Sequence, residues 1–146
     1  MEYIKYFSIQ KRLKQIISSP FIYGAVIGFV IFDLFLEIYH RICFPLYGLE
    51  IIDRKKYFKY DRRKLPYLSY LQKFNCFYCS YGNGLITYAR EIVGQTEKYW
   101  CGIRHEETAG FVEPIHHDEF IPYGDEKAFY ETYAKYENEC KLIQQR

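Results

Sequence analysis

The stretch FIYGAVIGFVIFDLFL, residues 21–36, decides the fold, because it is apolar apart from Asp33. Extended through Tyr39, it reaches the length of about 20 residues that a helix needs to cross a bilayer. A buried core helix would have the same composition. A membrane segment is favoured because a basic amphipathic stretch precedes it and a second aromatic and apolar stretch, residues 42–49, follows it. We therefore predict a membrane-embedded helix over about residues 20–40.

A basic amphipathic helix is predicted for residues 1–18, where apolar and basic side chains are interspersed. The apolar members are Ile4, Phe7, Leu13, Ile16 and Ile17, and the basic ones are Lys5, Lys11, Arg12 and Lys14. Such a helix can lie in a membrane surface. Ser19 and Pro20 predict a break before the apolar helix. Residues 1–49 are therefore predicted to form a membrane-anchoring segment.

The composition sets limits on what the rest of the chain can be. Of its 146 residues 21% are aromatic, with 17 tyrosines and 12 phenylalanines, which is high for a soluble domain and requires burial or an interface. The length leaves room for one small domain after the anchor, residues 50–146. A net charge of +2 does not describe a chain built as a whole to neutralise phosphates.

We predict that residues 50–146 are mainly helical. Pro66 fits the first turn of one helix, and the pair Asn83 and Gly84 predicts a turn between that helix and a second one. The second helix has an apolar face at helical spacing, formed by Leu85, Ile86, Ala89, Ile92 and Val93. Residues 106–123 are predicted to be irregular, and a last helix is predicted to begin at Asp125.

Three cysteines and a histidine form the most informative chemical pattern. Cys76 and Cys79 have C-x2-C spacing, and Cys101 and His105 supply a second pair of ligands. Zinc favours thiolate and imidazole ligands in a tetrahedral site, so these four residues are predicted to hold one ion, zinc first and iron second. Two alternatives stay open. The pair Cys76 and Cys79 could cycle between dithiol and disulfide, or the cysteines could simply be buried.

Two further polar groups qualify this pattern. Asp33, Glu37 and His40 share one face of the apolar helix, and the spacing of the last two is that of half a carboxylate-bridged di-iron site. No second half is present, so a polar face that contacts the rest of the protein is favoured. Residues 116–119, His-His-Asp-Glu, could extend the metal site or form a second one, but their place between prolines is more typical of a solvated loop.

The basic residues predict how the protein is oriented. They cluster directly after the apolar segment, at Arg54, Lys55, Lys56, Lys59, Arg62, Arg63 and Lys64. Aromatic residues between them could stack on single-stranded nucleic acid, but a place beside a membrane anchor favours contact with anionic lipid. The positive-inside tendency puts the C-terminal domain on the cytoplasmic side. An odd number of cysteines, five, with no secreted disulfide framework agrees with that reducing compartment.

Several segments together resemble a family of small uncharacterised bacterial membrane proteins. The resemblance lies in residues 61–85 and 96–105, with support from residues 44–48 and 123–126, and so covers most of the chain. The family pattern reads NCxYCxYxNG, then Glu-Ile, then TExYWCxIxH. The matching residues are Asn75, Cys76, Tyr78, Cys79, Tyr81, Asn83, Gly84, Glu91, Ile92, Thr96, Glu97, Tyr99, Trp100, Cys101, Ile103 and His105. Relatives carry proline where Gly102 stands. The resemblance implies a membrane-anchored, cysteine-rich protein and no particular reaction.

These observations predict a mainly α protein with N-terminal amphipathic and membrane-embedded helices, followed by a small helical domain that a zinc-type site pins together. Its expected role is non-enzymatic, as an interaction or assembly module that meets membrane lipid and a protein partner. The alternative is a membrane-associated enzyme that uses the metal or a CxxC dithiol for redox chemistry. No phosphate-binding loop, dinucleotide fingerprint or serine-elbow motif is present in the sequence.

Overall fold

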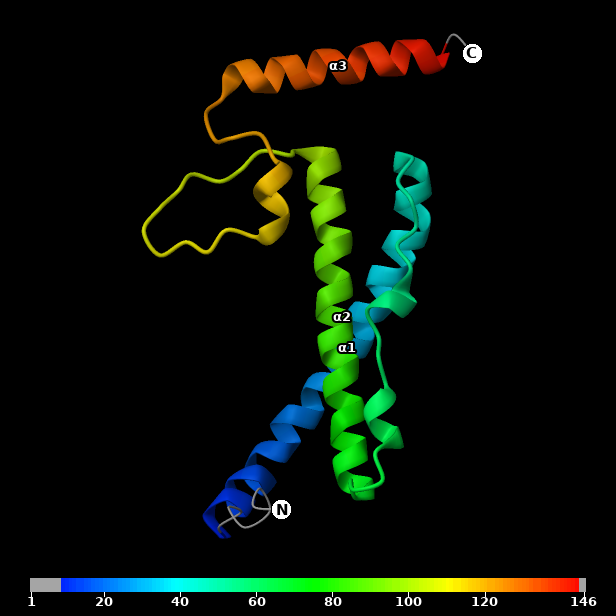
Figure 1. The fold of residues 1–146 in the computed structure, drawn as a ribbon, viewed down its shortest axis with the longest axis vertical. Coiled ribbons are helices and arrows are strands. Elements are labelled where there is room, and N and C mark those ends of the chain that lie inside the picture. Colours follow the sequence, from blue (N-terminus) through cyan, green and yellow to red (C-terminus); the bar gives the residue numbers. More distant parts are fainter. Residues whose placement is uncertain (1–8, 145–146) are drawn as a thin grey trace. The chain divides into compact units, whose positions relative to one another are not determined.

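A computed structural model describes residues 9–144 and shows three long helices (Figure 1). In chain order the elements are α1 (Ile9–Tyr47), the short 3-10 helices η1 (Arg54–Lys56) and η2 (Asp61–Lys64), α2 (Tyr70–Trp100), the 3-10 helix η3 (Ile115–Glu119) and α3 (Glu126–Gln144). The only β pairing within the described residues is one bridge between Ile103 and Ile121. The predicted mainly α class is therefore confirmed. The chain forms two compact units, which divide between Arg90 and Glu91 inside α2.

The predicted break at Ser19 and Pro20 is wrong, because α1 is continuous through both residues. Pro20 cannot donate a backbone hydrogen bond and would normally weaken the helix there. At this turn the hydroxyls of Ser18 and Ser19 donate to the Gln15 carbonyl at 3.1 and 2.6 Å. The amphipathic stretch from Ile9 onward is thus the first part of α1, and residues 1–8 of that prediction lie outside the described residues.

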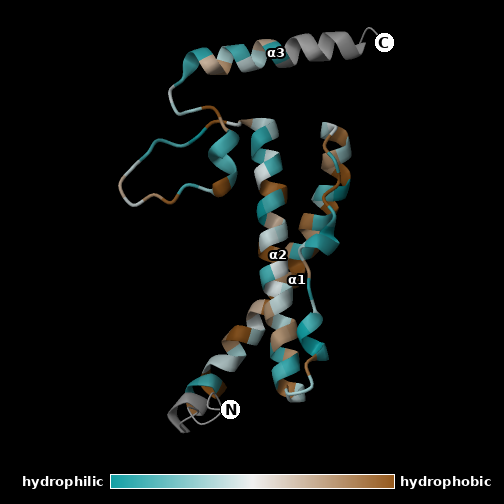
Figure 2. Ribbon diagram, in the orientation of Figure 1, coloured by the Kyte–Doolittle hydropathy of each residue, from teal (hydrophilic) through white to brown (hydrophobic). Residues whose placement is uncertain are grey.

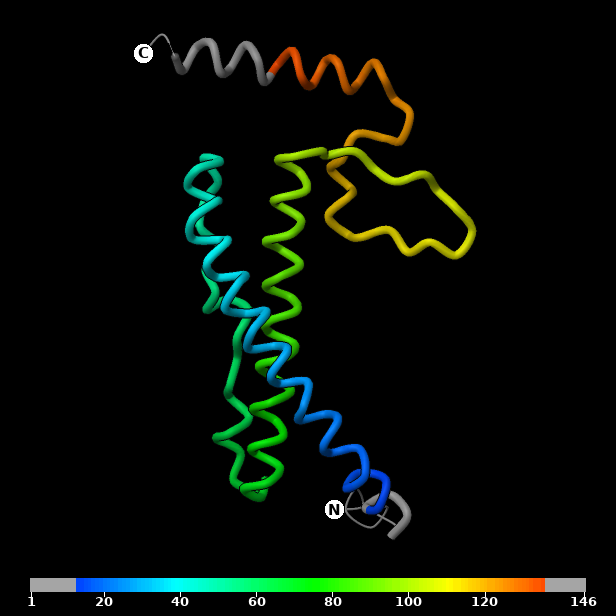
Figure 3. Tube along the Cα trace, turned by 180° about the vertical axis from the view of Figure 1, so that it is seen from behind, coloured from blue at the N-terminus to red at the C-terminus, as the bar shows by residue number. Residues whose placement is uncertain are grey.

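A connection of 22 residues, 48–69, which we call the return segment, leads from α1 back to the start of α2. It begins at Gly48, whose positive φ of 70° ends α1 while Leu49 N–H donates to the Phe44 carbonyl at 2.9 Å. Because the return segment leads back along the helix pair, α1 and α2 run in the same direction, and they cross at an oblique angle (Figures 1 and 3). The Tyr78 hydroxyl donates to the Ile22 carbonyl near one end of the pair, and Tyr88 meets His40 near the other.

The predicted turn at Asn83 and Gly84 is also wrong, because both residues lie inside α2. The Asn83 side chain donates to the Cys79 carbonyl at 2.8 Å, so its amide has a hydrogen-bond partner within the helix. Gly84 has a packing reason instead: a Cβ there would come within 2.9 Å of both the Phe58 ring and the Tyr57 carbonyl. Glycine at this position lets the return segment approach the α2 backbone closely.

The two faces of α1 have opposite environments. One face packs on the rest of the first unit, whose buried apolar residues are Leu36, Phe44, Leu85, Tyr88 and Ala89. The opposite face, which we call the outer face of α1, consists of Ile16, Ile17, Ile27, Ile31, Leu34, Phe35, Ile38, Ile42 and Leu46. Each of these nine side chains is at least 47% exposed. Figure 2 shows the concentration of apolar residues along this helix.

The second unit is built around the end of α2 and the 3-10 helix η3. Gly102, at a φ of 59°, ends α2, and its N–H donates to the Glu97 carbonyl at 3.0 Å. The Arg104 N–H donates to the Ile121 carbonyl and closes the intervening loop. Ile92, His117 and Phe120 are buried here. The predicted start of the last helix is confirmed, because the Asp125 carboxylate accepts from the Ala128 N–H at 2.9 Å as an N-cap.

Candidate functional site

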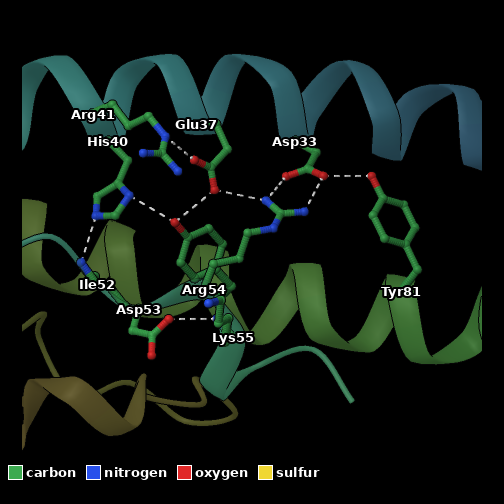
Figure 4. Close-up of polar contacts among 10 residues, drawn as sticks. Asp33, Glu37, His40, Arg41, Ile52, Asp53, Arg54, Lys55 and Tyr81 are labelled. Carbon is green, nitrogen blue, oxygen red and sulfur yellow. Dashed lines mark hydrogen bonds and ion pairs between the residues drawn. The ribbon is translucent and has the colours of Figure 1, made fainter. Parts of the chain in front are cut away.

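The polar residues of α1 meet one arginine of the return segment (Figure 4). The Arg54 guanidinium donates to the Asp33 carboxylate, with one N···O distance of 2.7 Å, and to Glu37 at 2.9 Å. The planar fork of arginine suits this arrangement, in which one cation holds two carboxylates one helical turn apart. The guanidinium carbon also lies 4.2 Å from the centre of the Phe58 ring. The hydrogen bonds that Arg54 donates to Asp33 and Glu37 raise the pKa of Arg54, so it stays a cation.

Two tyrosines of α2 complete this group, which we call the Arg54 network. The Tyr81 hydroxyl donates to Asp33 at 2.9 Å, and the Tyr88 hydroxyl donates to Glu37 at 3.0 Å. Burial and the hydrogen bond to Asp33 raise the pKa of Tyr81 to about 12. The network therefore joins α1, the return segment and α2 through charge-assisted hydrogen bonds.

The position of protons around His40 follows from its partners. Its Nε2 accepts from the Ile52 backbone N–H at 3.0 Å, so that nitrogen carries no proton. The proton of the neutral ring must then sit on Nδ1, which lies 2.9 Å from the Tyr88 hydroxyl. His40 thus donates to Tyr88, and Tyr88 donates to Glu37. The prediction of a polar face on α1 that contacts the rest of the protein is confirmed, and these residues serve packing rather than half of a di-iron site.

A second polar cluster lies within the second unit, where Glu97 of α2 contacts two adjacent histidines of η3. The Glu97 carboxylate oxygens lie 2.9 Å from His116 Nε2 and 3.2 Å from His117 Nε2. One potential ligand atom from each of the three residues lies within 4.8 Å of the others. Burial alone would raise the pKa of Glu97, but the hydrogen bonds from the two histidines outweigh it and hold that pKa below its ordinary value.

The packing around this cluster is close. His117 is fully buried, with its ring stacked on Phe120 at a centroid distance of 4.7 Å. A Cβ at Gly94 would lie 3.0 Å from the His116 ring, so glycine at this position leaves room for that ring to pack on α2. The prediction of a solvated loop at residues 116–119 is therefore wrong for His117. Sequence reasoning missed Glu97 as its partner, because the two are separated by an irregular loop that gives no periodic signal.

The four predicted zinc ligands are distributed over both units. Cys76 and Cys79 lie in the first half of α2, in the first unit, while Cys101 follows the last residue of α2 and His105 lies in the loop after it. Their joint binding of zinc stays a prediction.

His105 nevertheless lies beside the second cluster. Its ring centre is 5.5 Å from that of His117, and it packs edge-on against Phe111. The neighbouring Arg104 forms ion pairs at 3.8 Å with Glu113 and at 3.9 Å with Asp118. These charged side chains surround the Glu97 cluster without entering it.

Comparison with protein-family models, with curated proteins and with solved structures finds no match. The function of the protein is therefore inferred from its own residues. The family resemblance of the sequence stays a prediction.

Proposed function

We propose that the protein is a membrane-anchored interaction module and that the outer face of α1 lies in the lipid. The observation that carries this proposal is the uncharged, exposed surface along one side of α1, opposite a face on which Asp33 and Glu37 are paired with Arg54. Exposed apolar side chains in a continuous stripe of this length mark an interaction surface. The helix is long and apolar enough to cross a membrane between Leu13 and Tyr47.

We further propose that α1 lies along the membrane surface instead of crossing it. The candidate membrane helix Leu13–Tyr47 is 35 residues long, or about 50 Å, well beyond the hydrocarbon thickness of about 30 Å. Beside its middle runs the return segment, where Lys55, Lys56 and Lys59 are exposed. Charged side chains and non-helical backbone at that level would have to enter the hydrocarbon if α1 stood upright. An in-plane α1 leaves them in water.

The proposed role is recruitment or assembly at the membrane and does not depend on a reaction. At the start of α2, Tyr70, Leu71 and Phe74 are each at least 57% exposed and offer an aromatic surface to lipid or to a protein partner. The alternative, a redox enzyme, would use Cys76 and Cys79. Those two residues lie inside α2 and not at its N-terminus, where a helix dipole would activate a thiol. The interaction module is therefore the better-supported proposal.

Membrane retention tests the role of the outer face. We expect the protein to stay with membranes in a high-salt wash, because apolar burial is not screened by salt, and to be released by detergent. Ile31→Glu should shift the protein toward the soluble fraction. Val93→Glu is the matched control, because both side chains are 52% exposed, and it should leave partitioning unchanged. Equal partitioning of the two variants would contradict the proposal.

Single reporter cysteines test the orientation, in a variant whose native cysteines are serine. Lys14→Cys and Glu50→Cys place one exposed reporter near each end of α1. An in-plane helix on the cytoplasmic face predicts that a membrane-impermeant thiol reagent labels neither in intact cells and both after the cells are opened. Labelling of one reporter alone in intact cells would show that α1 crosses. Labelling of both would place the protein on the outside.

A further inference from the structure

We propose that Glu97, His116 and His117 bind one divalent transition-metal ion, with zinc as the best-fitting metal, within the second unit. Two imidazoles and a carboxylate are a ligand set that zinc accepts, and three protein ligands leave a position for water. The proposal is independent of the membrane role, since it concerns residues on a different part of the chain. It also differs from the predicted cysteine site, with which it shares no ligand.

The side chains of Glu97, His116 and His117 converge on one point. The Nε2 atoms of two adjacent histidines both point to one carboxylate, at 2.9 and 3.2 Å. Ligand atoms from all three residues lie within 4.8 Å of one another, so small side-chain rotations would place them around one ion. The three come from two elements, α2 and η3, so an ion here would also tie the loop between them to the helix.

The number of N–H groups on the two histidine rings also favours a metal ion. The Nδ1 atoms of both histidines are buried and have no hydrogen-bond partner among the described residues. On His117, Nδ1 lies 3.5 Å from a Glu113 oxygen, while Nε2 faces Glu97. A neutral imidazole has only one N–H, so one of the two carboxylates must face a lone pair. Adding a proton to each ring would place two cations side by side, with ring centres 4.7 Å apart.

A metal ion resolves this conflict. It takes the lone pairs of both Nε2 atoms and leaves the N–H of His117 on Nδ1, which lies 3.5 Å from a Glu113 oxygen. Histidine ligands commonly donate their second N–H to a carboxylate in this way, which fixes the ring and strengthens the ligand. Glu113 is itself held by an ion pair with Arg104 at 3.8 Å. The cluster therefore has the ligands of a metal site and the supporting carboxylate.

The test measures metal binding by the purified full-length protein in detergent, with zinc titration and Co²⁺ absorption as readouts. We expect Glu97→Gln and His116→Gln each to weaken zinc binding by at least about 100-fold, and Glu113→Gln by about 10-fold to 100-fold as the loss of a supporting group. Glu119→Gln is the matched control. Glu119 is an exposed glutamate that pairs with Lys98 outside the cluster, and its change should leave zinc affinity within about threefold.

Co²⁺ distinguishes the two possible ligand sets. Thiolate ligands give intense sulfur-to-cobalt charge-transfer absorption in the near ultraviolet, whereas nitrogen and oxygen ligands give none. We expect a spectrum without that absorption, unchanged by Cys76→Ser or Cys101→Ser. Metal-free melting curves of each variant establish that it is folded. The proposal is overturned if the folded His116→Gln protein keeps its zinc affinity, or if the thiolate absorption appears.

Discussion

Arg54→Ala is expected to lower the free energy of unfolding by about 2–3 kcal/mol, toward the lower end of the cost of breaking a buried ion pair. The substitution leaves Asp33 without its cation and Glu37 with Arg41 alone, at 2.8 Å, on a helix whose surroundings are mostly apolar. The Arg54 side chain is 32% exposed, so water enters part of the network and the loss stays below that of a fully enclosed group. Chemical unfolding in detergent, followed by circular dichroism, measures the change.

Two companion variants show whether the loss comes from the network. Arg63→Ala removes an exposed arginine of the same segment and should change stability by less than about 0.5 kcal/mol. Adding Asp33→Asn and Glu37→Gln to Arg54→Ala removes the uncompensated charges and should restore part of the lost stability. If Arg54→Ala and Arg63→Ala unfold alike, the network does not stabilise the first unit.

Gly84→Val is expected to destabilise the first unit by about 1–3 kcal/mol or more, which is the usual cost of forcing extra atoms into a packed site. Even a Cβ at this position would lie 2.9 Å from the Tyr57 carbonyl, which belongs to the backbone and cannot rotate away. The return segment would have to move from α2, and Phe58 would move with it. The Arg54 guanidinium that packs on Phe58 would then lose its position.

Glycines of α1 provide the control for this prediction. A Cβ at Gly28 would have no atom within 4 Å, so Gly28→Ala should keep or raise stability, by up to about 1 kcal/mol, through helix propensity. Thermal unfolding of both variants in the same detergent tests the contrast. A Gly84→Val protein as stable as the parent would show that the return segment does not pack as closely as described.

The long apolar run of the sequence was sufficient to predict α1, but the local signals for helix ends were misleading. Pro20, and Asn83 with Gly84, are typical of breaks and turns. α1 nevertheless continues through Pro20, and Gly84 gives room to the return segment. Propensity describes a short window, whereas Gly84 packs against Tyr57 and Phe58, which lie elsewhere along the chain.

In the candidate sites, too, local spacing predicts some features, while others depend on the path of the chain. Spacing on one helix placed Asp33, Glu37 and His40 on a common face. It could not identify Arg54 among seven basic residues, because that depends on the path of the return segment. The histidine pair in η3 was noticed, but Glu97, 19 residues before His116, was not connected with it. The joint metal site of Cys76, Cys79, Cys101 and His105 stays a prediction.

The shared direction of α1 and α2 has a consequence for biosynthesis. When the last residue of α1 has been synthesised, Glu37 can pair only with Arg41 of the same helix, and Asp33 has no partner, since Arg54 follows and the tyrosines that complete the network lie 48 and 51 residues beyond the two acids. An insertion machinery that sorts segments as they emerge would meet an apolar helix with an unpaired Asp33, which is costly at the centre of a bilayer. The placement along the membrane surface proposed above would let this helix stay in the interface until Tyr81 and Tyr88 have been synthesised.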